Sequence, residues 1–136
     1  MRIILDTDVL IAAVVKPRSY SARVLRMVGE GAVELAVDER ILREYRRILR
    51  HFRFRLSTQE ADALVKELGE KAVRVTPTTR ARGLPDAGDV PFVEVALAAE
   101  ADALVTANLR HYPREAVGGV KVTTARDFIR GLAGAG

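Results

Sequence analysis

The stretch that decides the fold is residues 2–11, RIILDTDVLI, in which a short apolar run ends in three polar residues. Arg2–Leu5 is predicted to be a buried β-strand, and Val9–Val15 is predicted to be the helix that follows it. Asp6 therefore lies directly after a strand buried in the core. A carboxylate at such a position is costly unless a cation or hydrogen-bond donors meet it.

The same alternation of short apolar runs and longer helical stretches continues along the chain. Further strands are predicted at Val33–Val37, Ala72–Val75, Ala103–Thr106 and Val120–Thr123. Further helices are predicted at Ser21–Val28, at Glu39–Phe52 and at Ser57–Lys71. Asp38 is the expected cap of the second of these, and a capping box opens the third. Two more helices are predicted, one from the acids Asp86–Asp89 through Ala99 and one after the cap at Thr124. This alternation predicts an α/β fold, a three-layer α/β/α domain with a parallel sheet of four to five strands. Ligands of such sheets bind at the carboxyl ends of the strands.

Length and composition narrow the class of protein. The 136 residues suit one domain, expected at 1–131, followed by a short flexible Gly/Ala tail at 132–136. The absence of cysteine excludes a thiolate zinc site, disulfides and a cysteine nucleophile, and it suits a reducing cytoplasm. The N-terminus does not resemble a signal peptide, and no apolar run approaches the ~20 residues of a membrane span. We therefore expect a cytoplasmic protein. The net charge of +4 and the pI of about 9.8 favour a nucleic-acid partner.

Acidic residues recur where this fold would place a site. Asp6, Thr7 and Asp8 follow the first strand, although Asp8 has an alternative role as a helix cap. Glu44 falls at the margin of an apolar helix stripe, where it could face a cleft or remain an ordinary solvated glutamate. The opposite face of that helix carries four arginines, for which a solvated surface is the expected role: Arg43, Arg46, Arg47 and Arg50.

Two later segments add polar groups. Asp86 and Asp89 precede a helix with an early proline, and because only one of them can cap that helix, the other is left for another role. Thr106 and Asn108 follow the fourth strand. The Asn108 carbonyl oxygen could ligate a hard cation, with turn chemistry as the alternative. Thr7 and Thr106 could orient water or backbone.

These groups converge on one edge of the predicted sheet. Carboxylates ~4 Å apart repel by about 4 kcal/mol per pair at an effective dielectric near 20. Such a cluster raises its own pKa values or recruits a divalent cation. Oxygen ligands without cysteine select Mg²⁺ or Mn²⁺. The chemistry indicated is metal-assisted phosphodiester hydrolysis.

Four motifs in order then resemble the PIN-domain family over nearly the whole chain. They are residues 3–11 (IILDTDVLI), 41–45 (ILREY), 86–89 (DAGD) with Phe92 and Ala96, and 104–108 (LVTAN) with the following 111–113 (HYP). The resemblance implies that Asp6, Glu44 and Asp89 are the catalytic, metal-binding acids, with Asp86 as an auxiliary ligand. It also implies strand order 3-2-1-4-5, Mg²⁺ or Mn²⁺ dependence, RNA cleavage, a homodimer, and a toxin role in a toxin–antitoxin pair with an antitoxin partner.

Two departures from the family pattern keep an alternative open. Asp8 stands where asparagine is usual, and Asn108 stands where many members carry a fourth aspartate; both are further candidates for metal contact. The alternative is a PIN-like module with weak or no catalysis that binds RNA or a protein partner. Arg80 and Arg82, in the loop before the acids, are candidate RNA contacts in either case. Haloacid-dehalogenase-type phosphatases and response-regulator receivers fit less well, because the order or position of their required residues fails.

Overall fold

The computed structural model describes residues 1–52 and 55–135. Its strands are β1 (Arg2–Leu5), β2 (Glu34–Val37), β3 (Val73–Arg74), β4 (Ala103–Val105) and β5 (Val122–Thr123). All neighbouring strands pair in parallel, in the order β3-β2-β1-β4-β5. In the register of the central pairs, Ile3 lies opposite both Leu35 and Ala103. The predicted α/β class and strand order are therefore confirmed.

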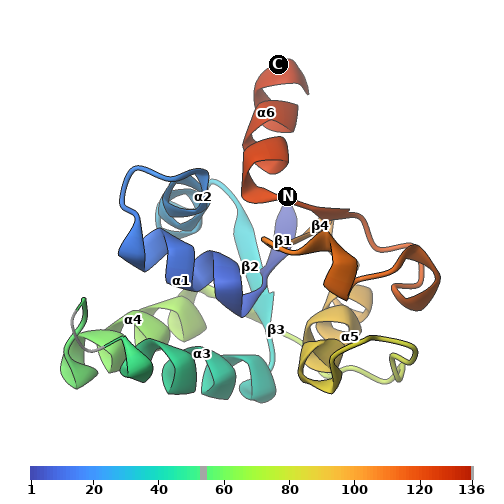
Figure 1. The fold of residues 1–136 in the computed structure, drawn as a ribbon, viewed down its shortest axis with the longest axis horizontal. Helices are drawn as coiled ribbons and strands as arrows, with labels where there is room; N and C mark the ends of the chain where they lie inside the picture. Colours follow the sequence, from blue (N-terminus) through green and yellow to red (C-terminus); the bar gives the residue numbers. More distant parts are fainter. Residues whose placement is uncertain (53–54, 136) are drawn as a thin grey trace.

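Helices flank this sheet (Figure 1). They are α1 (Thr7–Val15), α2 (Tyr20–Gly29), α3 (Glu39–His51), α4 (Thr58–Lys71), α5 (Val90–Ala98) and α6 (Ala125–Ala135). Short 3₁₀ turns lie at η1 (Ala87–Asp89), η2 (Leu109–His111) and η3 (Arg114–Ala116). No helix in the described part of the chain is both long and apolar enough to cross a membrane.

Local capping explains why most helices begin where the sequence predicts. The Asp38 side chain accepts a hydrogen bond from the Ile41 N–H, and Ser57 and Glu60 form the reciprocal capping box. Helix α1 begins two residues earlier than expected, because the Asp6 side chain caps it at Thr7.

The chain's last segment differs from its prediction. The sequence predicts a Gly/Ala tail from residue 132, whereas α6 continues through Ala135. Leu132 is partly buried against the core, and this contact gives the last turns a packing partner that composition alone does not reveal. Burial of one apolar side chain can favour helix over irregular chain despite nearby glycines.

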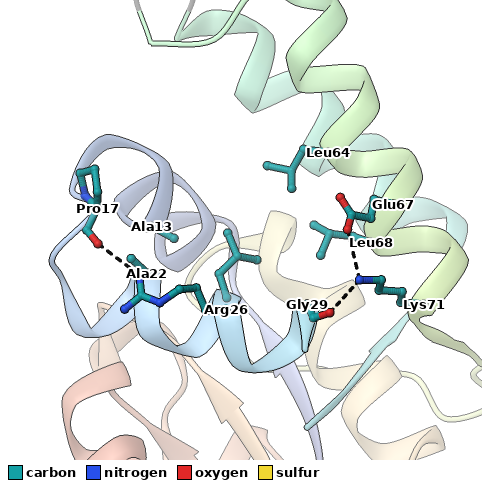
Figure 2. Close-up of a pocket in the computed structure, with 10 residues that line it drawn as sticks. Ala13, Pro17, Ala22, Arg26, Gly29, Leu64, Glu67, Leu68 and Lys71 are labelled. Atoms are coloured by element: carbon teal, nitrogen blue, oxygen red, sulfur yellow. Dashed lines mark hydrogen bonds and ion pairs between the residues drawn. The ribbon is translucent and has the colours of Figure 1, made fainter. Parts of the chain in front are cut away.

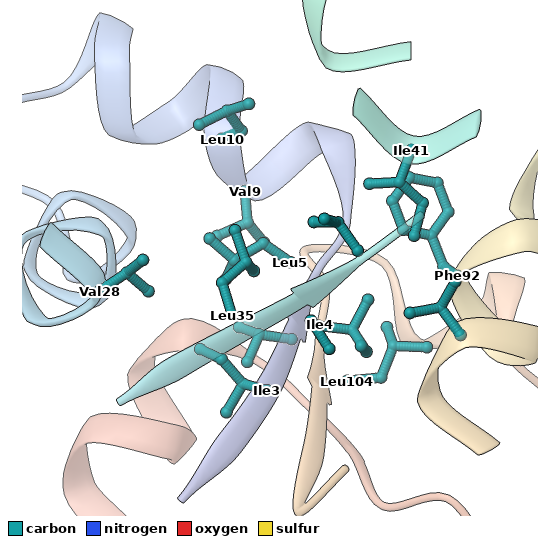
Figure 3. Packing of buried hydrophobic residues seen from close by; sticks show 14 of the residues in the cluster. Ile3, Ile4, Leu5, Val9, Leu10, Val28, Leu35, Ile41, Phe92 and Leu104 are labelled. Atoms are coloured by element: carbon teal, nitrogen blue, oxygen red, sulfur yellow. The ribbon is translucent and has the colours of Figure 1, made fainter. Parts of the chain in front are cut away.

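The core lies on both faces of β1, whose residues Ile3, Ile4 and Leu5 are almost fully buried. In Figure 3, Ile4 and Leu104 point toward Phe92 of α5, while Leu35 lies with the side chains of α1. Because β1 is covered on both sides, its sequence is continuously apolar rather than alternating. The first polar residue after it, Asp6, emerges at the carboxyl edge of a rigid sheet.

Candidate active site

Asp6 is held by three hydrogen bonds at the carboxyl end of β1. Only 5 % of its surface is exposed. Its Oδ1 accepts from the Thr7 N–H at 2.7 Å, and its Oδ2 accepts from the Thr106 hydroxyl at 2.9 Å and the Tyr112 hydroxyl at 2.8 Å. The backbone N–H of Asp6 also donates to the Val105 carbonyl at 2.9 Å. The carboxylate orientation is therefore set by residues that follow β4, about a hundred positions away in the chain.

Asp89 reaches the same region from the start of α5. The Asp86 Oδ1 accepts from the Gly88 N–H at 2.8 Å and caps the short turn η1, while Asp89 occupies the N-cap position of α5 without a side-chain capping bond. Only 8 % of the Asp89 surface is exposed, and its buried Oδ2 has no hydrogen-bond partner among the described residues. The Nδ1 of His111 lies 3.2 Å from this oxygen, close enough for charge attraction but without hydrogen-bond geometry. An orphaned buried carboxylate oxygen is an unusual feature that requires an explanation.

Burial and mutual repulsion raise the pKa values of two acids at this edge of the sheet. Burial, followed by the charges of Asp6 and Asp86, raises the pKa of Asp89 to about 6, and His111 opposes this shift. Burial and the charge of Asp6 also raise the pKa of Asp8, although N–H groups of the backbone partly offset them. Carboxyl groups that destabilise one another's charged forms favour the binding of a cation, which would offset the repulsion.

Asp8 and Asn108, the further candidates for metal contact, also have local roles. Both Asp8 carboxylate oxygens lie 3.3 Å from the Ala107 N–H, which links the start of α1 to the loop after β4. Asn108 is exposed, and its Oδ1 accepts from the Arg110 N–H at 3.2 Å, as in an ordinary Asx turn. Thr106 is fully buried and donates to Asp6, so its orienting role acts on that carboxylate. Thr7 orients Asp6 through its backbone N–H rather than its side chain.

Glu44 stands apart from this cluster in the structure. Its carboxylate forms a two-point ion pair with Arg47, at 2.7 and 3.1 Å, and its side chain is 35 % exposed. Besides burial, the charges that raise the Asp89 pKa are those of Asp6, Asp86 and Asp8. Across residues 1–52 and 55–135, no three histidine or acidic side chains are already close enough to enclose a metal ion. Glu44 as a ligand stays a prediction, and it requires the pair with Arg47 to open.

The chemistry of the assembled donors nevertheless fits a divalent cation. Asp6 and Asp89 supply carboxylate oxygens, one of them buried without a partner, and Asp8 and Asp86 add negative charge nearby. A hard cation with oxygen ligands would remove the repulsion that raises the Asp89 pKa. The residues that would hold it are Asp6 and Asp89, with Asp8, Asp86 and Glu44 able to contribute.

A second carboxylate on α5, which sequence reasoning missed, is fully compensated. The Glu94 side chain is 7 % exposed, and it accepts from Arg40 at 2.8 Å and from the Ala81 N–H at 2.9 Å. Burial acts to raise the Glu94 pKa, but the hydrogen bonds from Arg40 and Ala81 outweigh it and lower that pKa. Arg80 and Arg82 flank Ala81 and are exposed, and the charge of Arg80 further lowers the Glu94 pKa. Their loop is thus anchored beside the site.

Tyr112 and His111 are the other contributors that single-residue reasoning did not find. Both belong to the fourth motif, and in the structure Tyr112 donates to Asp6 and His111 faces Asp89. Burial and the negative charge of Asp6 raise the Tyr112 pKa, so this hydroxyl remains a hydrogen-bond donor. A tyrosine a few residues beyond the end of a strand is the signal that could have indicated it.

A separate apolar groove of about 290 Å³ lies between α2 and α4 (Figure 2). Its lining includes Ala13, Leu25, Leu64 and Leu68 together with the charged Arg26, Glu67 and Lys71. The Lys71 ammonium bridges the two helices, donating to the Gly29 carbonyl at 2.7 Å and pairing with Glu67 at 3.1 Å. None of these residues belongs to the acidic site.

Comparisons with known proteins agree with the fold and the order of the motifs. The family model described as "PIN domain" matches residues 2–110. Comparison with curated protein sequences gave no match. The fold is similar to that of a chain in the crystal structure of VapBC2 from Rickettsia felis bound to a promoter DNA fragment. The two chains are 13% identical, with a TM-score of 0.61, and the match covers 90% of this chain and 97% of that one. It is also similar to a chain of VapBC-1 from nontypeable Haemophilus influenzae, with 15% identity, a TM-score of 0.61, and coverage of 93% and 99%. The chain belongs to the PIN domain family.

Proposed function

We propose that this protein is an endoribonuclease that hydrolyses RNA phosphodiester bonds with Mg²⁺ or Mn²⁺ held by Asp6, Glu44 and Asp89. The observation that carries the proposal is the buried, unpartnered Oδ2 of Asp89 beside the oriented carboxylate of Asp6. Stability alone does not favour a buried carboxylate oxygen without a hydrogen-bond donor at this place, whereas cation binding does.

Each residue has a defined part in this mechanism. A bound divalent cation would supply charge to activate water and to neutralise the scissile phosphate. Asp6 is preorganised by Thr106 and Tyr112, so little reorientation is needed when the site is filled. The pKa of Asp89 is raised to about 6, so this carboxyl is mostly ionised and able to bind a cation at pH 7 to 8. Asp86 and Asp8 strengthen the negative field around both.

We further propose that the nuclease is the toxin of a toxin–antitoxin pair, acts in the cytoplasm, and forms a homodimer. The sequence resemblance implies this role, and the two similar solved folds are both VapBC chains. The apolar groove between α2 and α4 offers an antitoxin segment a surface distinct from the acids.

The direct test measures Mn²⁺ binding and RNA cleavage by the wild type and the Asp6→Asn variant, with and without EDTA. We expect one Mn²⁺-dependent heat signal and EDTA-sensitive cleavage in the wild type, both lost in the variant. Circular dichroism checks that the variant is folded. Induced expression in a bacterial host tests the toxin role: the wild type should arrest growth and Asp6→Asn should not.

The alternative function is a catalytically weak PIN module that binds RNA or a partner. The ion pair between Glu44 and Arg47 is the observation that favours it, because it removes one expected ligand from the site. RNA binding without cleavage at saturating Mn²⁺ would select this alternative.

A further inference from the structure

The outer face of α3 carries a continuous arginine surface. Arg43, Arg46, Arg47 and Arg50 lie at helical spacings of i, i+3, i+4 and i+7, and with His51 they line a hollow of about 480 Å³. We call these four arginines the α3 arginine face. The hollow has no aromatic or aliphatic residue among those that line it.

Acids compensate this face only in part. Arg47 pairs with Glu44, and Arg50 pairs with Asp62 through two contacts of 2.7 and 2.9 Å. Arg46 acts on Asp62 through its charge alone, and Arg43 forms no ion pair with any residue the structure describes. Four cations face two carboxylates, which leaves an excess positive charge on one exposed surface.

The position of α3 connects this face to the acidic site. Helix α3 follows β2 directly, so its first turn lies at the carboxyl edge of the sheet, next to the start of α5 (Figure 1). From Arg43 to Arg50 the helix rises roughly 10 Å and leads away from that edge. The arginines thus extend away from the sheet edge that carries Asp6 and the start of α5.

We propose that the α3 arginine face binds the phosphates of the RNA segment next to the cleaved bond. The inference rests on RNA being the substrate of the proposed function. Guanidinium groups match phosphate oxygens in two-point contacts. A protein partner would be expected to use an apolar or aromatic anchor, and the lining of the hollow contains none. Because every nucleotide carries the same phosphate, these contacts are to the RNA backbone rather than the bases. Their contribution to RNA affinity is therefore independent of RNA sequence.

The test measures binding of a fluorescent single-stranded RNA by anisotropy, in EDTA so that no cleavage occurs, over a series of salt concentrations. The variant is Arg43→Gln/Arg46→Gln, which leaves both ion pairs of the face intact. The matched control is Arg126→Gln/Arg130→Gln on α6, which removes the same charge from two exposed arginines on a helix that points away from α3 (Figure 1). Circular dichroism confirms folding of both.

We expect the α3 variant to bind at least 5-fold more weakly at low salt. The slope of log affinity against log salt should fall by about 1.4, since each phosphate contact to a single strand contributes about 0.7. The α6 control should keep the wild-type slope. Equal losses in both variants would overturn the proposal, because net charge alone would then explain binding. The salt dependence of polyglutamate binding is measured in the same way. If the α3 variant lowers the salt slope for polyglutamate as well as for RNA, the proposal is overturned in favour of an acidic protein partner.

This experiment separates the inference from the proposed function. Wild-type protein that binds RNA through Arg43 and Arg46 but never cleaves it would refute the nuclease and retain the arginine face. Wild-type protein that cleaves RNA with an unchanged salt slope in the α3 variant would retain the nuclease and refute the face.

Discussion

Two buried carboxylates, Asp89 at the N-cap of α5 and Glu94 within it, lie in opposite electrostatic environments. Glu94 is met by Arg40 and by a backbone N–H, and its pKa is lowered. Asp89, at the N-terminus of the same helix, has an oxygen without a hydrogen-bond donor and is surrounded by other acids, and its pKa is raised to about 6. One carboxylate joins α3, α5 and the loop before α5 into a single structure. The other is held in a state that a cation would stabilise.

The two acids differ in how the protein compensates their charge. Burial is nearly the same for both groups, so exposure alone does not distinguish them. The distinguishing property is whether the protein supplies the compensating charge itself. Changing each acid to its amide should therefore have opposite effects.

The largest expected effect is that of Asp89→Asn on catalysis. The amide keeps the shape but removes the charge that would hold a cation, so RNA cleavage should fall by at least about 100-fold, in the range seen when one charge-stabilising group is removed. Cleavage of a labelled RNA under single-turnover conditions measures this. Glu94→Gln is the control and should retain cleavage within a few-fold; equal losses in both variants would remove the distinction between the two acids.

The pH dependence of stability should sharpen the contrast. Because the folded pKa of Asp89 is raised from 3.8 to about 6, its contribution to stability is fully present below pH 4 and is lost as pH rises through 6. In EDTA, the free energy of unfolding of Asp89→Asn, relative to that of the wild type, should therefore rise by up to about 3 kcal/mol between pH 4 and pH 7. Urea unfolding of both proteins at several pH values measures this difference. A constant difference across the range would show that Asp89 is compensated in solution.

Glu94→Gln should lower the free energy of unfolding, whereas Asp89→Asn should raise it. Loss of its charge weakens the contact with Arg40 and disturbs the acceptor for the Ala81 N–H, so the free energy of unfolding at pH 7.5 should fall by about 2 kcal/mol. Thermal unfolding in EDTA gives the comparison with Asp89→Asn, which should be more stable than wild type under the same conditions. A stabilised Glu94→Gln variant would contradict the structural role of this acid.

The smallest expected effect comes from Tyr112→Phe. This change keeps the ring packing but removes the hydroxyl that donates to Asp6, so one of its three hydrogen bonds is lost. Mn²⁺ affinity measured by titration calorimetry should fall about 10-fold, as is usual when a group that orients a ligand is removed. Tyr45→Phe is the matched control, because the Tyr45 hydroxyl donates to the Leu5 carbonyl and not to a carboxylate. An equal loss in both variants would indicate a general packing effect.

Sequence alone determined the α/β class, most helix boundaries and the candidate acids. Apolar run lengths and caps are local signals, so the strand at Arg2–Leu5 and the caps at Asp38 and Ser57 were predictable from a few adjacent residues. The placement of Asp6 after a buried strand was predictable for the same reason. That Asp86 and Asp89 could not both cap one helix also followed from sequence; in the structure Asp86 caps η1, and Asp89 stands at the N-cap position of α5 without a side-chain capping bond.

Only the tertiary structure decided which side chains meet. The bonds from Thr106 and Tyr112 to Asp6 and the ion pair between Arg40 and Glu94 join residues far apart in the chain. The pairing of Glu44 with Arg47 is local, but whether a glutamate at a stripe margin turns toward a cleft or toward its own helix depends on the packing around it. Long-range contacts and burial set the charge balance of each carboxylate, and neither is encoded in the spacing of residues along one element.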